Sequence, residues 1–256
     1  MFPLRDDNPT QLTPVVTIGV LLANVAVWLY VQGAGMSQSV LADSVCTWGM
    51  IPAEITGTTG AYEAVQLAPG APPCVFGGLR HGGALTSMFL HGSWLHLLAN
   101  MWFLWLFGNN VEDSMGHLRY ALFYVLTGAG AAVGHIVAGP DSMIPTVGAS
   151  GAISGLMGAY LVLYPRVKIQ TLFIFVFIFR VIAVPAWLVL VLWFALQLLA
   201  GATDPLAEAG VAFWAHIGGF VAGVVLVKLF ENRQLVAARS RHVQLAADEI
   251  RYRGWL

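Results

Sequence analysis

The chain has 256 residues, of which 58% are hydrophobic and 10% charged, whereas soluble domains are about half apolar and a quarter charged. Its formal net charge of -1 leaves no basic excess for neutralising phosphates, which excludes nucleic acid as the expected partner. The composition therefore predicts an all-α polytopic membrane protein that has the lipid bilayer as its main surroundings.

Six apolar segments have the length of membrane-spanning helices, which need about 20 residues to cross ~30 Å of hydrocarbon. The expected spans are 14–31, 86–107, 118–138, 148–164, 183–200 and 210–230. The first is longer than the roughly 7–15 apolar residues of a secretion signal, so we expect it to be retained. Together the spans form a membrane domain over 14–230, with a long extramembrane loop at 32–85. Segments 1–13 and 231–256 flank this domain as an N-terminal segment and a C-terminal tail.

The basic residues predict the orientation, because cytoplasmic loops retain positive charge. They precede the first span or follow the second, fourth and sixth: Arg5, Arg119, Arg166, Lys168, Lys228, Arg233, Arg239, Arg241, Arg251 and Arg253. The opposite loops contain Arg80 alone. Both termini are therefore expected in the cytoplasm.

Loop 32–85 contains the two cysteines of the chain, Cys46 and Cys74. They form a disulfide if that side of the membrane is oxidising, or remain two unpaired thiols. The loop has no histidine or further cysteine at zinc-ligand spacing, so we expect no metal site.

Residues 172–179 alternate between phenylalanine and aliphatic residues, a strand-like period that places the four phenylalanines on one face. The run between Lys168 and Arg180 is too short for a helical span. We interpret it as an interfacial or protein-packed segment that leads to Pro185.

Polar groups occur in three of the spans, where they are costly and therefore candidates for function. The second span contains His91, His96 and Asn100, the fourth begins at GASG around Ser150, and the sixth contains His216. At 1.5 Å per helical residue, His96, Asn100, Ser150 and His216 lie about 18 to 25 Å from the charged end of their span. We therefore expect one polar layer, displaced towards the outer leaflet.

These residue types suit acyl transfer. Ser150 would begin a helix, whose free N–H groups stabilise an anion, and Gly148 and Gly151 would allow close approach of a substrate. A histidine at the same depth supplies a general base for the hydroxyl. His96 and Asn100 are four residues apart, so both can donate to one oxyanion.

Packing is the competing explanation, because small residues at four-residue spacing allow helices to approach closely in lipid. It applies to Gly151 with Gly155, to Ser150 with Ser154, and above all to Gly219 and Gly223. The other histidines, His91, His117, His135 and His242, are interpreted as interfacial or hydrogen-bonded, and for His91 a part in shaping the site is kept as the alternative. The tryptophans of the spans are interpreted as interfacial belt and packing residues: Trp102, Trp105, Trp187, Trp193 and Trp214.

In this order, the motifs resemble those of the rhomboid family of intramembrane serine proteases, over roughly 14–230. They are GMIPAE at 49–54, HGSWLHLLAN, GNNVEDSMG with Gly108, Glu112 and Gly116, GASG, and AHIGGFVAG. The implied fold is a six-helix rhomboid bundle.

The resemblance also implies a chemistry. Ser150 would be the nucleophile and His216 the base, while His96, Asn100 and the backbone N–H of Ser150 would hold the oxyanion. Glu112 would stabilise the loop after the second span. The family needs no metal or cofactor and cleaves single-span membrane proteins near the outer membrane face. A bacterial inner membrane is the expected location.

No third catalytic residue is evident, since Asp204 and Glu208 lie in or near an outer loop and a buried carboxylate is costly. We therefore expect a dyad. One alternative is a catalytically silent rhomboid-like protein that binds membrane clients. Another is a transporter or channel, which the absence of repeated halves disfavours. The sequence predicts no oligomeric state.

Overall fold

The computed structural model describes residues 2–58, 63–67, 70–76, 82–175, 178–203, 211–240 and 250. Helices dominate this part of the chain, which confirms the predicted class. The α-helices are α1 (Val15–Ala26), α2 (Gln38–Trp48), α3 (Pro52–Thr56), α4 (Gly83–Thr86), α5 (Trp94–Met115), α6 (His117–Ala138), α7 (Ser150–Leu163), α8 (Ala186–Thr203), α9 (Phe213–Phe230) and α10 (Arg233–Ser240). Short helices of other types are η1 (Val27–Val31), η2 (Gly33–Gly35) and η3 (Ser87–Phe89). The strands are β1 (Phe2–Asp6), β2 (Ala64–Val65), β3 (Cys74–Val75), β4 (Lys168–Phe175) and β5 (Ile178–Pro185).

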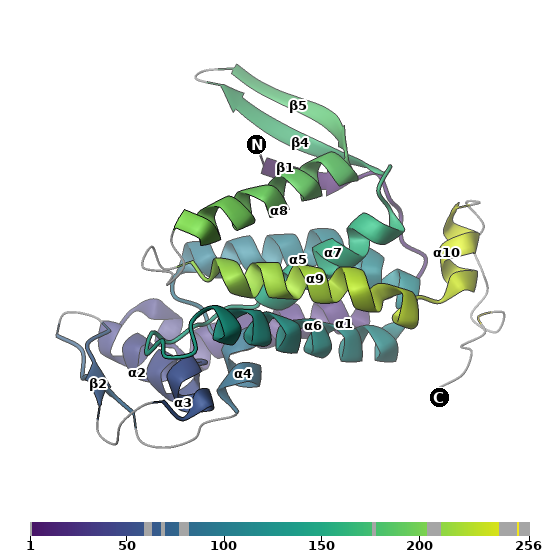
Figure 1. Cartoon of the computed structure of the whole chain (residues 1–256). Helices are drawn as coiled ribbons and strands as arrows, with labels where there is room; N and C mark the ends of the chain where they lie inside the picture. The colour runs from purple at the N-terminus through teal and green to yellow at the C-terminus, as the bar shows by residue number, and fades with distance from the viewer. Residues whose placement is uncertain are drawn as a thin grey trace.

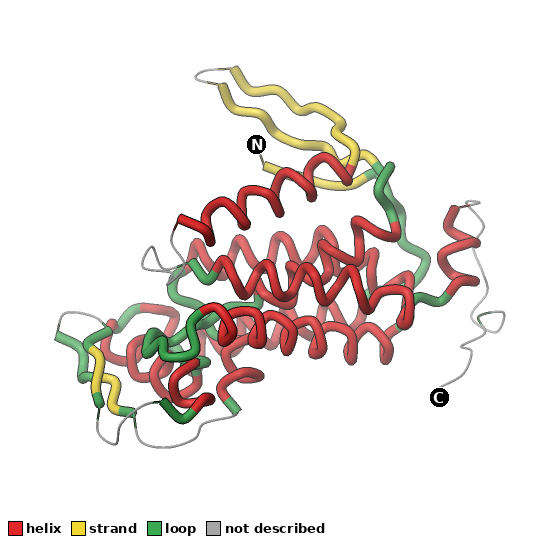
Figure 2. Tube along the Cα trace, viewed as in Figure 1, coloured by secondary structure: helices red, strands yellow, loops and turns green. Residues whose placement is uncertain are grey.

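Helices α1, α5, α6, α7 and α9 lie side by side in a bundle, and α8 covers one side of it (Figure 1). The short elements of the first loop, α2 to α4 with β2, gather at one end of the bundle, and α10 lies at the other (Figures 1 and 2).

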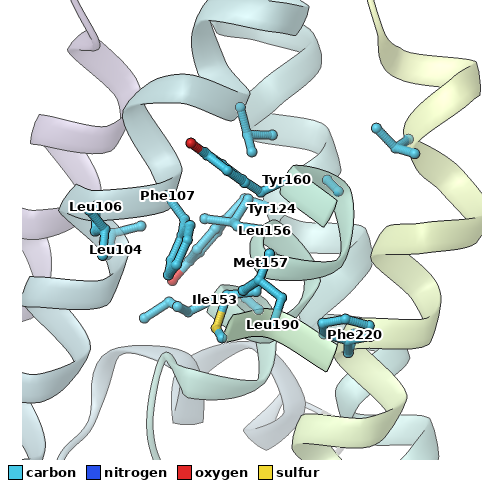
Figure 3. Packing of buried hydrophobic residues seen from close by; sticks show 14 of the residues in the cluster. Leu104, Leu106, Phe107, Tyr124, Ile153, Leu156, Met157, Tyr160, Leu190 and Phe220 are labelled. Atoms are coloured by element: carbon cyan, nitrogen blue, oxygen red, sulfur yellow. The ribbon is translucent and has the colours of Figure 1, made fainter. Parts of the chain in front are cut away.

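Helix α7 is the centre of the bundle and is buried continuously from Gly151 to Tyr160. A helix that is apolar or small on every side is expected to be buried, and α5, α6, α8 and α9 all pack against this one. Figure 3 shows the resulting core, in which Leu156 and Tyr160 of α7 lie among Phe107, Tyr124 and other buried side chains.

Glycines bring α7 and α9 into backbone contact. A Cβ added to Gly219 would meet the carbonyl oxygen of Gly151, and one added to Gly223 would meet that of Gly155. Small residues at four-residue spacing allow such an approach between helices. The contact fixes the relative height of the two helices, and so of the polar residues at their ends.

Three helices of the described residues are long and apolar enough to cross a membrane: His117–Ala138, Ala186–Thr203 and Phe213–Phe230. Val15–Val31 and Ser150–Leu163 are apolar but shorter. Many large apolar side chains on these helices face outward, Leu199 of α8 with 64% of its surface exposed. The chain is a membrane protein, and the count of six crossings stays a prediction.

Helix α5 differs in position from the expected span 86–107. It begins at Trp94, because the Oγ of Ser93 accepts a hydrogen bond from the backbone N–H of His96 at 3.1 Å and caps the helix. Residues 83–89 form the short helices α4 and η3 instead. At its other end the helix continues to Met115, because its polar residues there find partners in the N-terminal segment: Asn110 bonds to Asp6, and Asp113 accepts from the N–H of Gln11.

The carboxylate of Glu112 is buried and caps helix α1, whose own N-cap residue, Pro14, offers no side-chain hydrogen bond. It accepts bonds from the backbone N–H groups of Val16 at 2.9 Å and Thr17 at 2.8 Å, and from the Thr17 hydroxyl at 2.7 Å. It also contacts Nδ1 of His117 at 2.6 Å, beyond the loop that joins α5 to α6. Glu112 thus connects α1 with the α5–α6 junction. The sequence suggested contacts with the loop after the second span alone.

Strands β4 and β5 form a hairpin, and β1 pairs antiparallel with β4, with Phe2 opposite Leu172. The strand-like period therefore corresponds to a real sheet beside the helical bundle. The prediction that the four phenylalanines share one face is wrong for those that the structure describes, because Phe173 and Phe175 lie on β4 whereas Phe179 lies on β5, where the chain runs in the reverse direction. Phe177 lies outside the described residues. Phe179 pairs with Ile174, whereas Phe173 pairs with Arg180, so the reversal places these two phenylalanines on opposite faces.

Cys46 and Cys74 form a disulfide, with their Cα atoms 5.5 Å apart. This decides between the two alternatives that the sequence left open. The loop is also tied to the segment before α7, because Met50 and Thr146 exchange backbone hydrogen bonds of 3.0 and 2.8 Å.

Candidate active site

The turn into α7 depends on Gly148. Its φ of 128° lies in a region that L side chains rarely adopt, and its N–H donates to the carbonyl oxygen of Ser87 at 2.9 Å. Ser150 follows as the first residue of the helix, where the backbone N–H groups have no acceptor within the helix. The segment therefore presents a hydroxyl and free N–H groups at the same point.

His216 of α9 lies directly opposite this point. Its Nε2 is 2.8 Å from the Oγ of Ser150, which is hydrogen-bonding distance, and both side chains are half-buried. The glycine contacts between α7 and α9 begin less than one turn further along each helix, at Gly151 and Gly219. The close packing of the two helices thus brings the predicted serine and histidine together.

The other ring nitrogen of His216 has a partner that the sequence analysis missed. Nδ1 lies 2.7 Å from Oε1 of Gln197 on α8. The ring of Trp193, one turn earlier on α8, lies 5.9 Å from the His216 ring between centroids. The signal was present in the sequence, since Gln197 is the one amide in an otherwise apolar span. Asp204 and Glu208, considered there as third residues, lie outside the described residues.

A hollow of about 640 Å³ adjoins these groups. The four side chains predicted for the site line it together: His96, Asn100, Ser150 and His216. Trp193, Met50 and residues 144–148 contribute other parts of its wall. The hollow therefore opens among the bundle helices and the segments that connect them.

His96 and Asn100 supply donors to this hollow. Nδ1 of His96 accepts a long, 3.4 Å hydrogen bond from the N–H of Gly92, which leaves the proton on Nε2. A Cβ added to Gly148 would lie 2.8 Å from this Nε2 and 3.5 Å from the Ser150 Oγ. Nδ2 of Asn100 is buried and has no hydrogen-bond partner among the described residues. A buried, unpaired donor calls for an explanation, and a bound oxyanion supplies one.

His91 lies behind His96, with the two rings 5.1 Å apart and edge to face. The amide of Gln32 holds its backbone, accepting from the His91 N–H at 2.8 Å and donating to the His91 carbonyl at 2.7 Å. His91 thus supports the wall of the hollow. In the described part of the chain, no group of three His, Cys, Asp or Glu side chains is placed to hold a metal ion.

Comparisons with known proteins point to one family. The family model for the rhomboid domain matches residues 81–233. Rhomboid-like protein 11, chloroplastic, of Arabidopsis thaliana is 31% identical over 152 residues, which are 58% of this chain and 52% of that protein. Rhomboid protein 1, mitochondrial, of Saccharomyces cerevisiae is 30% identical over 166 residues, 63% of this chain and 45% of the relative. A putative rhomboid protease of Bacillus subtilis is 39% identical over 77 residues, 30% of this chain and 38% of the relative. The chain spans about half or less of the length of these relatives.

Proposed function

The chain belongs to the rhomboid family, and from this premise we propose that it is an intramembrane serine endopeptidase with a Ser150–His216 dyad. The observation that carries the proposal is the 2.8 Å separation of the Ser150 Oγ and the His216 Nε2. Relatives that are named proteases, in Bacillus subtilis and Toxoplasma gondii, support it.

The proposed reaction begins when His216 Nε2 takes the proton of the Ser150 hydroxyl as Oγ attacks the carbonyl carbon of a peptide bond. The negative charge that forms on the carbonyl oxygen is stabilised by the backbone N–H of Ser150 and by His96 Nε2 and Asn100 Nδ2. Such donors act strongly in a site shielded from bulk water, where the free donor of Asn100 already lies.

The C–N bond then breaks, and the imidazolium of His216 gives its proton to the departing amine. The acyl group stays on Ser150 as an ester. In the second half, water attacks this ester while His216 takes a proton from the water. Collapse of the second intermediate releases the carboxylic acid product and returns the proton to the Ser150 oxygen. No metal or cofactor takes part in this scheme.

The proposed substrates are single-span membrane proteins. The hollow beside Ser150 is formed by bundle helices with lipid-facing outer surfaces, so a substrate helix can approach from the bilayer. The residues around the cleaved bond would have to leave the substrate helix and extend. Within a helix, the carbonyl oxygen of that bond would accept a hydrogen bond from the backbone N–H four residues later.

We further propose that both termini face the cytoplasm and that the end containing Cys46 and Cys74 faces an oxidising compartment. The disulfide and the placement of basic residues near the opposite end support this. A bacterial inner membrane stays a prediction, since several relatives are named chloroplastic or mitochondrial.

The direct test is Ser150→Ala, combined with a fluorophosphonate probe that reacts with activated serines. We expect the purified wild type to be labelled and the variant to be folded but unlabelled, and we expect ectodomains shed from wild-type cells to disappear with the variant. An unlabelled wild type in a detergent that preserves its fold would contradict the proposal. It would favour a catalytically silent protein that binds membrane clients.

A further inference from the structure

Helix α8 turns one polar side chain towards the site. Its exposed face is apolar, with Leu196, Leu198 and Leu199 at 53%, 43% and 64% exposure, as expected of a surface in lipid. Gln197 lies between these residues in sequence yet is half-buried, and its Oε1 is 2.7 Å from His216 Nδ1. An amide within a span is costly unless it has a polar partner. The partner here is the histidine that faces Ser150.

Three residues at four-residue spacing form the face of α8 that meets α9. Trp193 packs its ring near the His216 ring, Gln197 bonds to it, and a Cβ at Gly201 would lie 3.3 Å from Cβ of Phe213. Residues four apart share one helix face, so the contact of Gln197 with His216 follows from the way α8 seats on α9.

We propose that Gln197 is a positioning residue that fixes the tautomer and the ring orientation of His216, so that Ser150, His216 and Gln197 form one hydrogen-bonded chain. The inference rests on the protease function proposed above and deepens it. Gln197 does not touch the substrate or the reacting atoms. It acts through His216.

The chemistry follows from the donor and acceptor properties of the groups. An amide oxygen accepts but does not donate, so the contact requires the proton of neutral His216 to be on Nδ1. Nε2 then presents its lone pair to the Ser150 hydroxyl, which is the arrangement that a general base needs. The opposite tautomer would place a proton between Nε2 and Oγ and could not accept one from the serine.

A neutral amide is a suitable orienting group at this depth. When His216 takes the serine proton, both ring nitrogens carry hydrogens, and the Nδ1–H bond to Oε1 remains and becomes charge-assisted. No proton moves to Gln197. A carboxylate in its place would strengthen the bond but would have to be desolvated before catalysis begins. The amide gives orientation without a buried charge.

The position of α8 is therefore also a condition for activity. Gln197 and Trp193, which contact His216, lie on α8, whereas the dyad itself lies on α7 and α9. Separation of α8 from α9 would leave the Ser150–His216 pair in place while releasing the tautomer of the base.

The experiment measures the rate of labelling by a fluorophosphonate probe over a range of probe concentrations, which separates the maximal rate, kinact, from the binding constant, KI. Full-length wild type is compared with Gln197→Met, Gln197→Asn and Gln197→Glu. Methionine has a similar length but no acceptor for the ring N–H, asparagine keeps the amide but is one methylene too short, and glutamate keeps an acceptor at the right place. Leu198→Met is the matched control on the lipid side of the same helix.

We expect Gln197→Met and Gln197→Asn each to lower kinact roughly tenfold, the effect of one lost hydrogen bond, with KI unchanged. Gln197→Glu should restore kinact to within about threefold of the wild type, and Leu198→Met should match the wild type. A wild-type kinact in both the methionine and asparagine variants would overturn the inference. A glutamate variant as slow as methionine would also overturn it, because glutamate keeps the size of glutamine and an acceptor for the ring N–H. Failure to label the wild type would instead overturn the protease function itself.

Discussion

Gly148 shows how closely the groups of the site are packed at the level of single residues. Its φ of 128° suits glycine, and any Cβ there would lie 2.8 Å from Nε2 of His96. We predict that Gly148→Ala lowers fluorophosphonate labelling of Ser150 by about 100-fold, because the loss of one oxyanion donor costs that much or more. Gly92→Ala is the control, since its Cβ would meet only His96 Nδ1, at 4.0 Å. Equal labelling of the two variants would contradict the role given to His96.

The residues of the site could be found from the sequence to different degrees. Ser150, His216, His96 and Asn100 stand out as polar groups in apolar spans, and counting along each helix places them at one depth. Gln197 satisfies the same criterion, but its meaning depends on the rotation of α8 about its axis, which the nearly uniform apolar sequence of that span does not specify. Its partner became visible only with the helices in place.

At the scale of the elements, the α7–α9 contact is the one that sets the geometry of the site. We predict that Gly223→Ala lowers the free energy of unfolding by about 1–3 kcal/mol, the cost of an overpacked contact, because its Cβ would meet the carbonyl oxygen of Gly155. Thermal unfolding in detergent is the measurement. Gly19→Ala in α1, where an added Cβ meets nothing within 4 Å, should leave stability unchanged or raise it. The same sign for both substitutions would argue against the close approach.

The Glu112 cap is a second contact between elements that can be tested. We predict that Glu112→Gln destabilises the protein by roughly 2 kcal/mol, because bonds to an ionised carboxylate are stronger than bonds to an amide and the α1 dipole loses its anion. Lys228→Gln removes an exposed lysine from its pair with Glu231, which keeps Arg233 at 4.0 Å, and should cost at most about 1 kcal/mol. Chemical unfolding curves of the two variants give the comparison, and a larger loss for Lys228→Gln would refute the buried cap.

The boundaries of the elements were harder to predict than their existence. The second span was expected at residue 86, but the cap at Ser93 and the buried polar residues after Gly108 shift the helix towards its far end. Strands β4 and β5 have the period of strands, yet one unbroken alternation of residue types covers parts of both, and the third strand of the sheet, β1, comes from near the N-terminus. Pairing partners so distant in sequence leave no local signal.

At the scale of the whole molecule, the disulfide and the basic residues divide the protein into two ends. Closing a loop with a sequence separation of 28 residues stabilises a protein by about 3–4 kcal/mol through the unfolded chain. We predict that reductant lowers the thermal unfolding midpoint of the wild type and leaves that of the Cys46→Ser, Cys74→Ser double variant unchanged. An unaltered wild-type midpoint under complete reduction would indicate that the loop is held by its other contacts, such as the bridge between Met50 and Thr146.

The overall arrangement was the most predictable level, because hydrophobicity and spacing decide which segments lie in lipid. Backbone hydrogen bonds join several of the segments that contain the basic residues used to predict the orientation. The N–H of Asp7 donates to the carbonyl oxygen of Lys168 at 2.9 Å, and the N–H of Asn232 donates to that of Ser114 at 2.7 Å. Arg80, Arg241, Arg251 and Arg253 lie outside the described residues. What the sequence did not reveal is the tilt and rotation of each helix, which depend on side-chain fit.

The anchoring of α1 by Glu112 has a consequence for biogenesis. The ribosome releases the first helix long before residue 112, so the nascent helix enters the membrane with its leading amides satisfied by water or lipid headgroups alone. The carboxylate can reach them only after α5 has been made as far as Glu112. The first segment is thus a late participant in tertiary assembly, although it is the first to be synthesised.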